Sequence, residues 1–184
     1  MKKMIYPFLF LVLSMGPLAT SQSQVPAEPG LYCSLQDRFK RIEGQVESFT
    51  RSGSRLAHGV TLGIKTSKRN VQILGKHAPA ILPPNPVFYY RVPPASQALG
   101  GTAGDLVLIK MEGKGDRRQF EVAAGGKGRA STGPSIRSQL QVFRELVEGE
   151  LYKLTPAQTL KRGEYCFYLY RTESPGLIYD FTVE

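Results

Sequence analysis

The C-terminal stretch, residues 150–184, constrains the fold of this chain more than any other. It contains two runs with strand-like alternation, separated by a turn at Ser174-Pro175-Gly176. The first run, residues 165–170, consists of aromatic, apolar and cysteine side chains. In the second run one set of side chains is apolar and the alternate set is more polar: Leu177, Tyr179, Phe181 and Val183 against Ile178, Asp180, Thr182 and Glu184. Because side chains alternate between the two faces of a strand, this pattern predicts a half-buried antiparallel hairpin.

A short motif precedes the first run. Leu160, Gly163 and Tyr165 form an L-x-x-G-x-Y spacing that resembles the tyrosine corner of immunoglobulin-like and fibronectin-like sandwiches. The resemblance implies that the Tyr165 hydroxyl bonds back to upstream backbone; the alternative is an ordinary half-buried strand tyrosine. Cys166 lies one residue beyond the tyrosine, where the immunoglobulin pattern has its cysteine two residues beyond, so the resemblance does not imply a core disulfide of that type.

Short apolar runs separated by turns continue through the rest of the chain. The composition includes 19 glycines and 13 prolines, which favours a turn-rich β protein. Further strands are expected at 31–35, 38–42, 45–50, 56–65, 71–74, 87–92, 105–111, 117–123 and 138–146, and a helix is the alternative for the last of these ranges. A proline-rich stretch, 78–94, suggests a boundary. We therefore predict a mainly β protein with a small N-terminal β subdomain at 24–82 and an immunoglobulin-like antiparallel β-sandwich domain at 83–184.

Residues 1–23 have the layout of a secretory signal peptide. Lys2 and Lys3 precede an apolar run, which is followed by small residues suited to cleavage. The alternative is a membrane anchor, but the apolar run is shorter than the ~20 residues that a transmembrane helix needs. We expect an exported protein, periplasmic or extracellular, with no transmembrane span after cleavage.

The two cysteines are Cys33 and Cys166, and each follows a Gly-x-Tyr. In an oxidising compartment, an even count without metal-ligand spacing predicts one disulfide. Two free buried thiols are the alternative. Neither cysteine has a neighbouring cysteine or histidine that would indicate redox or nucleophilic chemistry.

The net charge is +9, and the basic residues fall into two groups. One group comprises Lys110, Lys114, Arg117, Arg118, Lys127, Arg129 and Arg137; the other comprises Arg38, Lys40, Arg41, Arg51, Arg55, Lys65, Lys68 and Arg69. We single out Lys114, Arg117, Arg118, Lys127 and Arg129 as candidate anion-binding residues. If the two groups converge on one face, an anionic envelope polymer is the natural partner, with another envelope protein as the alternative. Otherwise they are solvated surface charges. Export disfavours nucleic acid.

Catalytic and metal-binding signatures are weak. The two histidines, His58 and His77, stand at no metal-ligand spacing, and no nucleophile elbow, phosphate-binding loop or zinc-protease motif occurs. No cofactor or metal is predicted. The expected function is a non-enzymatic binding or structural module of the cell envelope. The alternative is an exported hydrolase with a loop-built site near His58 and His77, because catalytic groups assemble across distant sequence.

The second half of the chain also resembles an arrangement seen in uncharacterised secreted bacterial proteins. The residues that carry it are Phe88-Tyr89-Tyr90 and the ranges 106–110, 117–122, 160–165 and 179–183. The resemblance implies export and a sandwich fold, and no activity.

Overall fold

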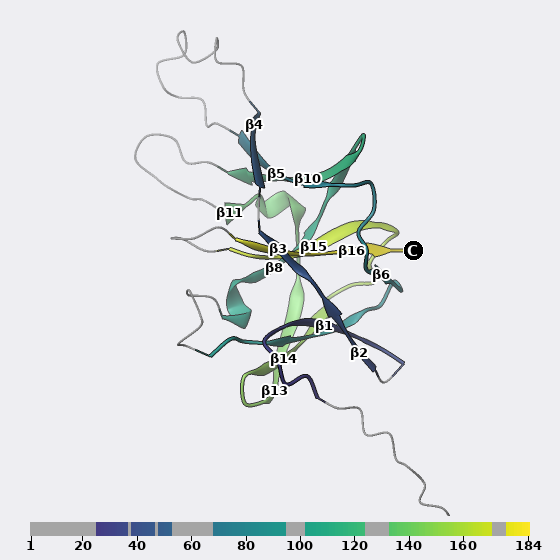
Figure 1. Ribbon diagram of the computed structural model, residues 1–184, viewed down its shortest axis with the longest axis vertical. Coiled ribbons are helices and arrows are strands. Elements are labelled where there is room, and N and C mark those ends of the chain that lie inside the picture. The colour runs from purple at the N-terminus through teal and green to yellow at the C-terminus, as the bar shows by residue number, and fades with distance from the viewer. Residues whose placement is uncertain are drawn as a thin grey trace, which may run out of the picture.

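Three β-sheets stacked face to face form the body of the protein (Figure 1). This computed structural model describes residues 25–36, 38–46, 48–52, 68–94, 102–123, 133–170 and 176–184. The predicted signal peptide, the strand expected at 56–65, His58, Lys127 and Arg129 lie outside these residues. Apart from two 3-10 turns, η2 (Ala103–Asp105) and η3 (Ile136–Ser138), the described elements are all strands. The prediction of a mainly β, antiparallel sandwich is confirmed.

The first outer layer, sheet A, has five antiparallel strands. Their order is β13 (Val142–Glu148), β14 (Leu151–Pro156), β7 (Val87–Arg91), β1 (Gly30–Leu35) and β2 (Arg38–Ile42).

The middle layer, sheet B, has the C-terminal hairpin at its centre. Its order is β12 (Gln139–Leu140), β8 (Leu106–Lys110), β15 (Gly163–Leu169), β16 (Leu177–Val183) and β3 (Gly44–Val46), and β6 (Ile81–Leu82) pairs in parallel with β16.

The second outer layer, sheet C, is formed by β11 (Gly133–Pro134), β10 (Arg117–Ala123), β5 (Lys68–Leu74) and β4 (Ser48–Ser52), with β9 (Glu112–Lys114) beside β10.

The middle sheet separates two hydrophobic cores. Core 1, between sheets A and B, contains Phe88, Phe167 and Phe181 in mutual ring contact. Core 2, between sheets B and C, is smaller and is built around Phe120 and Tyr168, whose rings lie 5.2 Å apart. Strands β8, β15 and β16 therefore send alternate side chains into different cores. The hairpin predicted to be half-buried is buried on both faces, because a middle layer has no face in contact with water.

Two continuous segments tie the layers together at their opposite edges. Residues 38–52 form the edge strand of sheet A, then of sheet B, then of sheet C, as β2, β3 and β4. Residues 133–148 form the other edges in the reverse order, as β11, β12 and β13. We call them strap 1 (38–52) and strap 2 (133–148). In Figure 1, β2 and β3 of strap 1 lie along one diagonal and β4 lies above them.

Every sheet combines strands from both sides of residue 83. That position is therefore not a boundary between sheets, and the division into 24–82 and 83–184 stays a prediction about folding units. The stack has three layers, whereas an immunoglobulin-like sandwich has two.

The predicted disulfide is wrong, since Cys33 and Cys166 are both free and buried. The reason is the direction of each side chain. Cys33 on β1 faces core 1, and Cys166 on β15 faces core 2, so the middle sheet lies between the two sulfurs. In the shared Gly-x-Tyr-Cys sequence, each cysteine and the tyrosine before it point to opposite faces of their strand. Tyr165 faces core 1, whereas Tyr32 lies on the other side of its strand from the core-facing Cys33.

Candidate functional site

A buried ion pair crosses core 2 and joins sheets B and C. Arg118 on β10 and Asp180 on β16 are 2% and 1% exposed, and one terminal guanidinium nitrogen of Arg118 donates to Oδ2 of Asp180. The other guanidinium nitrogens donate to the carbonyls of Leu74 (3.2 Å) and Gly75 (3.0 Å). Oδ1 of Asp180 accepts from Nε2 of Gln45 in strap 1 at 2.9 Å. The buried charges are therefore paired and hydrogen-bonded, as burial requires.

A second carboxylate extends this network toward the surface. Oε2 of Glu164 lies 3.7 Å from the guanidinium of Arg118, and its Oε1 lies 2.9 Å from Nδ1 of His77. The backbone N–H of Ala78 and the hydroxyl of Thr182 also donate to Glu164. The Glu164 side chain is 11% exposed and that of His77 is 75% exposed. The network thus runs from a buried interior to a histidine in solvent.

The His77–Glu164 pair resembles two members of a catalytic triad in its chemistry. An ionised carboxylate accepts hydrogen bonds and does not donate them, so Nδ1 of His77 is the donor to it, and a neutral imidazole in this tautomer has Nε2 as an acceptor. Within the described residues, no hydroxyl or thiol bonds to that nitrogen and neither of the clefts below is lined by His77. The described part of the chain also gathers no group of three metal-ligating side chains. Among the residues that the structure describes, the pair therefore has an orienting carboxylate but no hydroxyl or thiol to activate.

The larger cleft, of about 580 Å³, lies where two connections cross between sheets B and C. One crossing runs from β8 through Met111 into β9, and the other runs from β11 through η3 into β12. The lining residues are Asn70, Lys110, Met111, Glu112, Gln119, Phe120, Glu121, Ser135, Arg137 and Ser138. We call it the crossing cleft. Its size is within the range of small-ligand sites, and its lining has donors, acceptors and charges of both signs.

Lys110 also lines a smaller hollow of about 170 Å³ on the other side of β12. Lys161, Gln158 and Thr159 contribute to this hollow. The two hollows share Lys110, while Arg137 lines the larger one alone and Lys161 the smaller one. The sequence placed Lys110 and Arg137 in one basic group, but nothing in it indicated that two chain crossings would bring them to one cleft.

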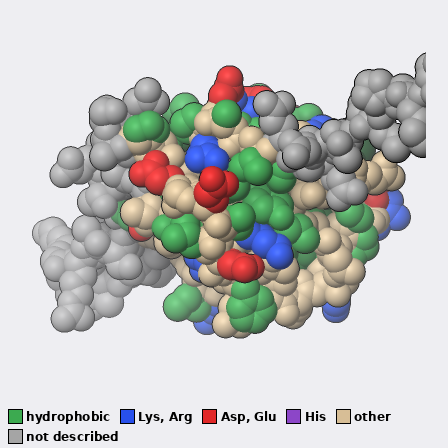
Figure 2. Space-filling model, turned by 90° about the horizontal axis from the view of Figure 1, so that it is seen from below, with side chains coloured by type: hydrophobic (Ala, Val, Ile, Leu, Met, Phe, Trp, Pro, Cys, Tyr) green, Lys and Arg blue, Asp and Glu red, His purple; other side chains and the backbone are tan. Residues whose placement is uncertain are grey.

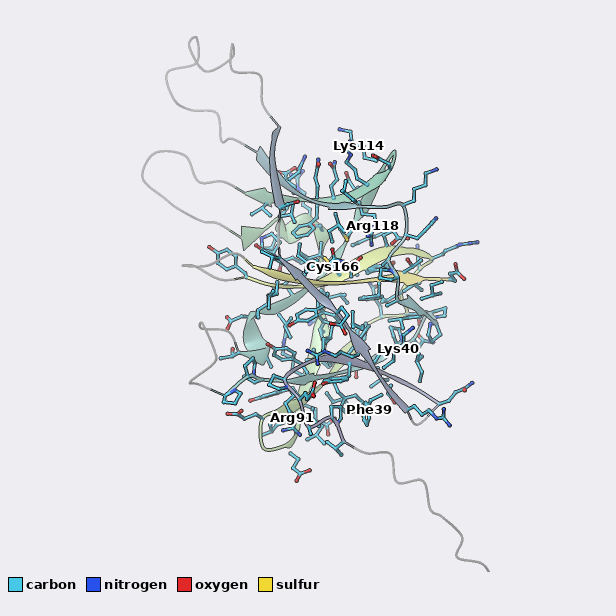
Figure 3. All side chains as sticks on the ribbon, in the orientation of Figure 1. Phe39, Lys40, Arg91, Lys114, Arg118 and Cys166 are labelled. Carbon is cyan, nitrogen blue, oxygen red and sulfur yellow. The ribbon has the colours of Figure 1, made fainter. Side chains whose placement is uncertain are left out.

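Of the five candidate anion-binding residues the structure describes Lys114, Arg117 and Arg118, and it does not bring these three together. Arg118 is buried in the ion pair, while Arg117 and Lys114, partners across β10 and β9, lie on the outer face of sheet C. Arg117 contacts Asp116 at 3.2 Å and Gln72 at 3.3 Å. Figure 3 shows Lys114 at the outer layer and Arg118 between the layers. Alternation along β10 separates Arg117 from Arg118, although they are adjacent in sequence.

The second basic group is divided between the two outer sheets, with Arg51, Lys68 and Arg69 on β4 and β5 of sheet C. The side chains of Arg38, Lys40 and Arg41 lie on β2 of sheet A, at the opposite end of the stack from Lys114 and Arg117. The outer face of sheet A, seen in Figure 2, has hydrophobic side chains near its middle with basic and acidic side chains around them. The ring contact of Phe39 with Tyr89, at 4.9 Å, belongs to this face.

The geometry of a tyrosine corner is present at Tyr165. Its hydroxyl donates to the carbonyl of Lys161 at 2.6 Å, Leu160 is buried in core 1, and Gly163 has φ +153°. The same local arrangement occurs at the start of β1, where the Tyr32 hydroxyl donates to the carbonyl of Glu28 at 3.0 Å after a glycine with φ +145°. The repeated Gly-x-Tyr-Cys sequence therefore encodes a strand start that is used twice.

No helix formed by the described residues has both the length and the apolar character needed to cross a membrane. Protein-family models give no match to this chain. Curated proteins give none either. Nor does any solved structure.

Proposed function

We propose that this protein is an exported, non-enzymatic binding or structural module of the cell envelope, and that it engages an acidic polymer at the crossing cleft. The proposal that the protein is exported rests on its N-terminal sequence. The observation that carries the binding proposal is that Lys110 and Arg137, from two separate chain crossings, both line one cleft that also has hydroxyl and amide groups. Lysine and arginine side chains beside such groups suit a carboxylate or sulfate flanked by hydroxyls.

The acidic residues of the same cleft narrow the class of polymer. Glu112 and Glu121 also line it, so a ligand with closely spaced negative charges, such as nucleic acid, meets repulsion there. A polysaccharide with one acidic group per few sugars places its charge at Lys110 and Arg137 and its hydroxyls at the carboxylates. The proposal is therefore an acidic polysaccharide rather than a polyphosphate.

The test is titration of an acidic polysaccharide, alginate or hyaluronan, against the purified protein by calorimetry. The combined change Lys110→Ala and Arg137→Ala should weaken binding roughly tenfold or more, because 1.4 kcal/mol is a factor of ten and two charge-assisted contacts are lost. The matched control is Lys114→Ala with Arg117→Ala, which removes the same charge from the outer face of sheet C. If the control weakens binding as much as the cleft variant does, the ligand is held by overall charge and the cleft is not the site.

The second candidate, an exported hydrolase, is favoured by one observation, the His77–Glu164 pair. If the pair is catalytic, the protein should hydrolyse activated esters such as p-nitrophenyl acetate well above the rate of free imidazole. The variant His77→Asn should then lose that activity while keeping its fold. Equal rates for the two proteins would remove this candidate. His58 lies outside the described residues.

A further inference from the structure

The two edges of sheet A carry opposite charge. At one edge, β2 exposes Arg38, Lys40 and Arg41. At the other edge, β13 exposes Glu145 and Glu148 together with Arg144, whose guanidinium donates to backbone carbonyls of its own chain. Within the described residues each of these strands pairs on one side alone, β2 with β1 and β13 with β14. Both strands therefore have a backbone edge with hydrogen-bonding groups available to another strand.

The β13 edge is also unusually apolar for an exposed strand. Phe143, Leu146 and Val147 are 62%, 57% and 50% exposed. Edge strands are commonly protected by lysines, prolines, bulges or short length. β13 has seven residues and one irregularity between Leu146 and Glu148, so its protection is slight. An exposed apolar edge of this length is a site for strand addition by a partner.

We propose that the partner is a second copy of this chain, whose β2 edge pairs with the β13 edge of the first. The five strands of sheet A alternate in direction, so β2 and β13 run parallel to each other. A neighbouring copy in the same orientation can therefore continue the sheet with a parallel β2–β13 pair.

The register of the sheet specifies which residues meet. One row of cross-strand partners runs from Glu145 through Lys153, Tyr89 and Tyr32 to Arg41. Extending that row into the next copy puts Arg41 of one chain opposite Glu145 of the other, on the outer face of the sheet. Two positions earlier on each strand, Phe39 comes opposite Phe143. Opposite charges and paired aromatics at directly facing positions are the contacts that stabilise neighbouring strands.

The row between these two is less favourable, because it brings two basic residues opposite each other. Lys40 comes opposite Arg144, but the Arg144 guanidinium is turned away to the carbonyls of Ala103 (3.0 Å) and Leu106 (2.7 Å). Lys40 is labelled beside Phe39 in Figure 3.

Charge also excludes the symmetric alternatives. Pairing β2 with β2 would bring basic residues together. Pairing β13 with β13 would bring Glu145 and Glu148 together in several registers, so charge disfavours both two-fold contacts. A β2–β13 contact uses different surfaces on the two copies, so each added copy leaves one edge free for the next. Since strap 1 forms the edges of all three sheets on one side and strap 2 does so on the other, each contact joins strap 1 of one copy to strap 2 of the next. The expected product is an open chain of molecules.

The test is sedimentation velocity on the mature protein over a hundredfold range of concentration at low salt. The native protein should form species that grow in size as its concentration rises, and 0.5 M NaCl should shift growth to higher concentration. Glu145→Arg and Arg41→Glu should each weaken self-association by about tenfold or more. A 1:1 mixture of the two variants should recover it, because each altered residue then faces its complement. Recovery on mixing separates lost contact from misfolding.

Two further measurements keep the proposal open to refutation. Phe143→Ser, which leaves every charge in place, should also weaken self-association. The exposed residue Ile136, on η3, supplies a matched control, because Ile136→Ser should leave self-association unchanged. The proposal is overturned if the native protein stays monomeric throughout, if it stops at a dimer, or if the mixed variants assemble no better than either alone.

Discussion

The buried ion pair between Arg118 and Asp180 offers the sharpest test of how the layers hold together. Arg118→Met removes the cation and keeps much of the side-chain volume. Asp180 then stays 1% exposed with Gln45 as its remaining side-chain donor, and Glu164 faces it without an intervening positive charge. Asp180→Asn removes the opposite charge. In that variant Arg118 keeps two backbone carbonyls and Glu164 at 3.7 Å.

These surroundings set the order and size of the two effects. Breaking a buried pair by removing one partner costs about 3–5 kcal/mol. Arg118→Met should lower the free energy of unfolding by about 5 kcal/mol, because two carboxylates lose their cation. Asp180→Asn should lower it by about 3 kcal/mol, because Glu164 still offsets part of the positive charge of Arg118. The double variant should be more stable than Arg118→Met alone, since it no longer buries an unpaired aspartate.

The assay is the free energy of unfolding from urea titration followed by circular dichroism. Arg117→Met is the matched control on the same strand, because its side chain is 41% exposed and its contact with Asp116 is a surface ion pair. It should change stability by less than about 1 kcal/mol. The reasoning is refuted if Arg118→Met costs no more than Arg117→Met, or if the double variant is less stable than both single ones.

Three smaller predictions test the layers, strap 1 and the tyrosine corner. Burial raises the pKa of the Cys33 thiol to about 11 and also raises that of Cys166, so the unfolded thiols ionise first and stability should fall as the pH rises from 9 toward 11. Both thiols should resist Ellman's reagent in the native state and react in urea without reductant; a need for reductant would show a disulfide. Gly44→Ala should lower the free energy of unfolding by about 1–3 kcal/mol, because a Cβ there would lie 2.9 Å from a tyrosine ring. Gly113→Ala, whose Cβ would have nothing within 4 Å, should change it by less than about 0.5 kcal/mol in urea unfolding. Equal effects of the two variants would contradict this reasoning. Tyr165→Phe should cost about 1 kcal/mol in urea unfolding through the lost bond to a backbone carbonyl, and no loss would show that the corner bond is dispensable.

Local patterns in the sequence predicted most of the strands but not every break between them. The range expected at 45–50 is divided between β3 in sheet B and β4 in sheet C, and the range expected at 138–146 is divided among η3, β12 in sheet B and β13 in sheet A. The ranges expected at 38–42 and 117–123 coincide with β2 and β10, because each is a short alternating run between turn residues. The motif around Tyr165 predicted a hydroxyl bond to upstream backbone that the structure contains. These features depend on residues close together in the chain, which is why a single sequence shows them.

The number of layers could not be predicted in this way. A strand such as β16, with Asp180 and Thr182 on one face, has the same pattern whether that face meets water or another sheet. The structure buries both residues, because sheet C supplies Arg118 as a partner and strap 1 supplies Gln45. The same ambiguity led to the incorrect disulfide prediction. Alternation gives the relative direction of neighbouring side chains, but it does not show which core each side chain faces. Which core a side chain faces depends on how distant strands pair, and this pairing cannot be deduced from a single sequence.

The position of the buried network indicates what it does. Its arginine donates to the carbonyls of Leu74 and Gly75, where the chain leaves sheet C, and Glu164 accepts from Ala78 as the chain reaches sheet B. Three of its hydrogen bonds therefore hold one crossing between layers. A buried ion pair adds little net stability compared with apolar packing, but it is costly to mispair, so it favours one alignment of two sheets over others. Core 2 is the smaller core and has fewer interlocking aromatic rings than core 1. We infer that the ion pair specifies the alignment of sheet C on sheet B, where packing alone specifies it least, and that His77 closes this structural network at the surface.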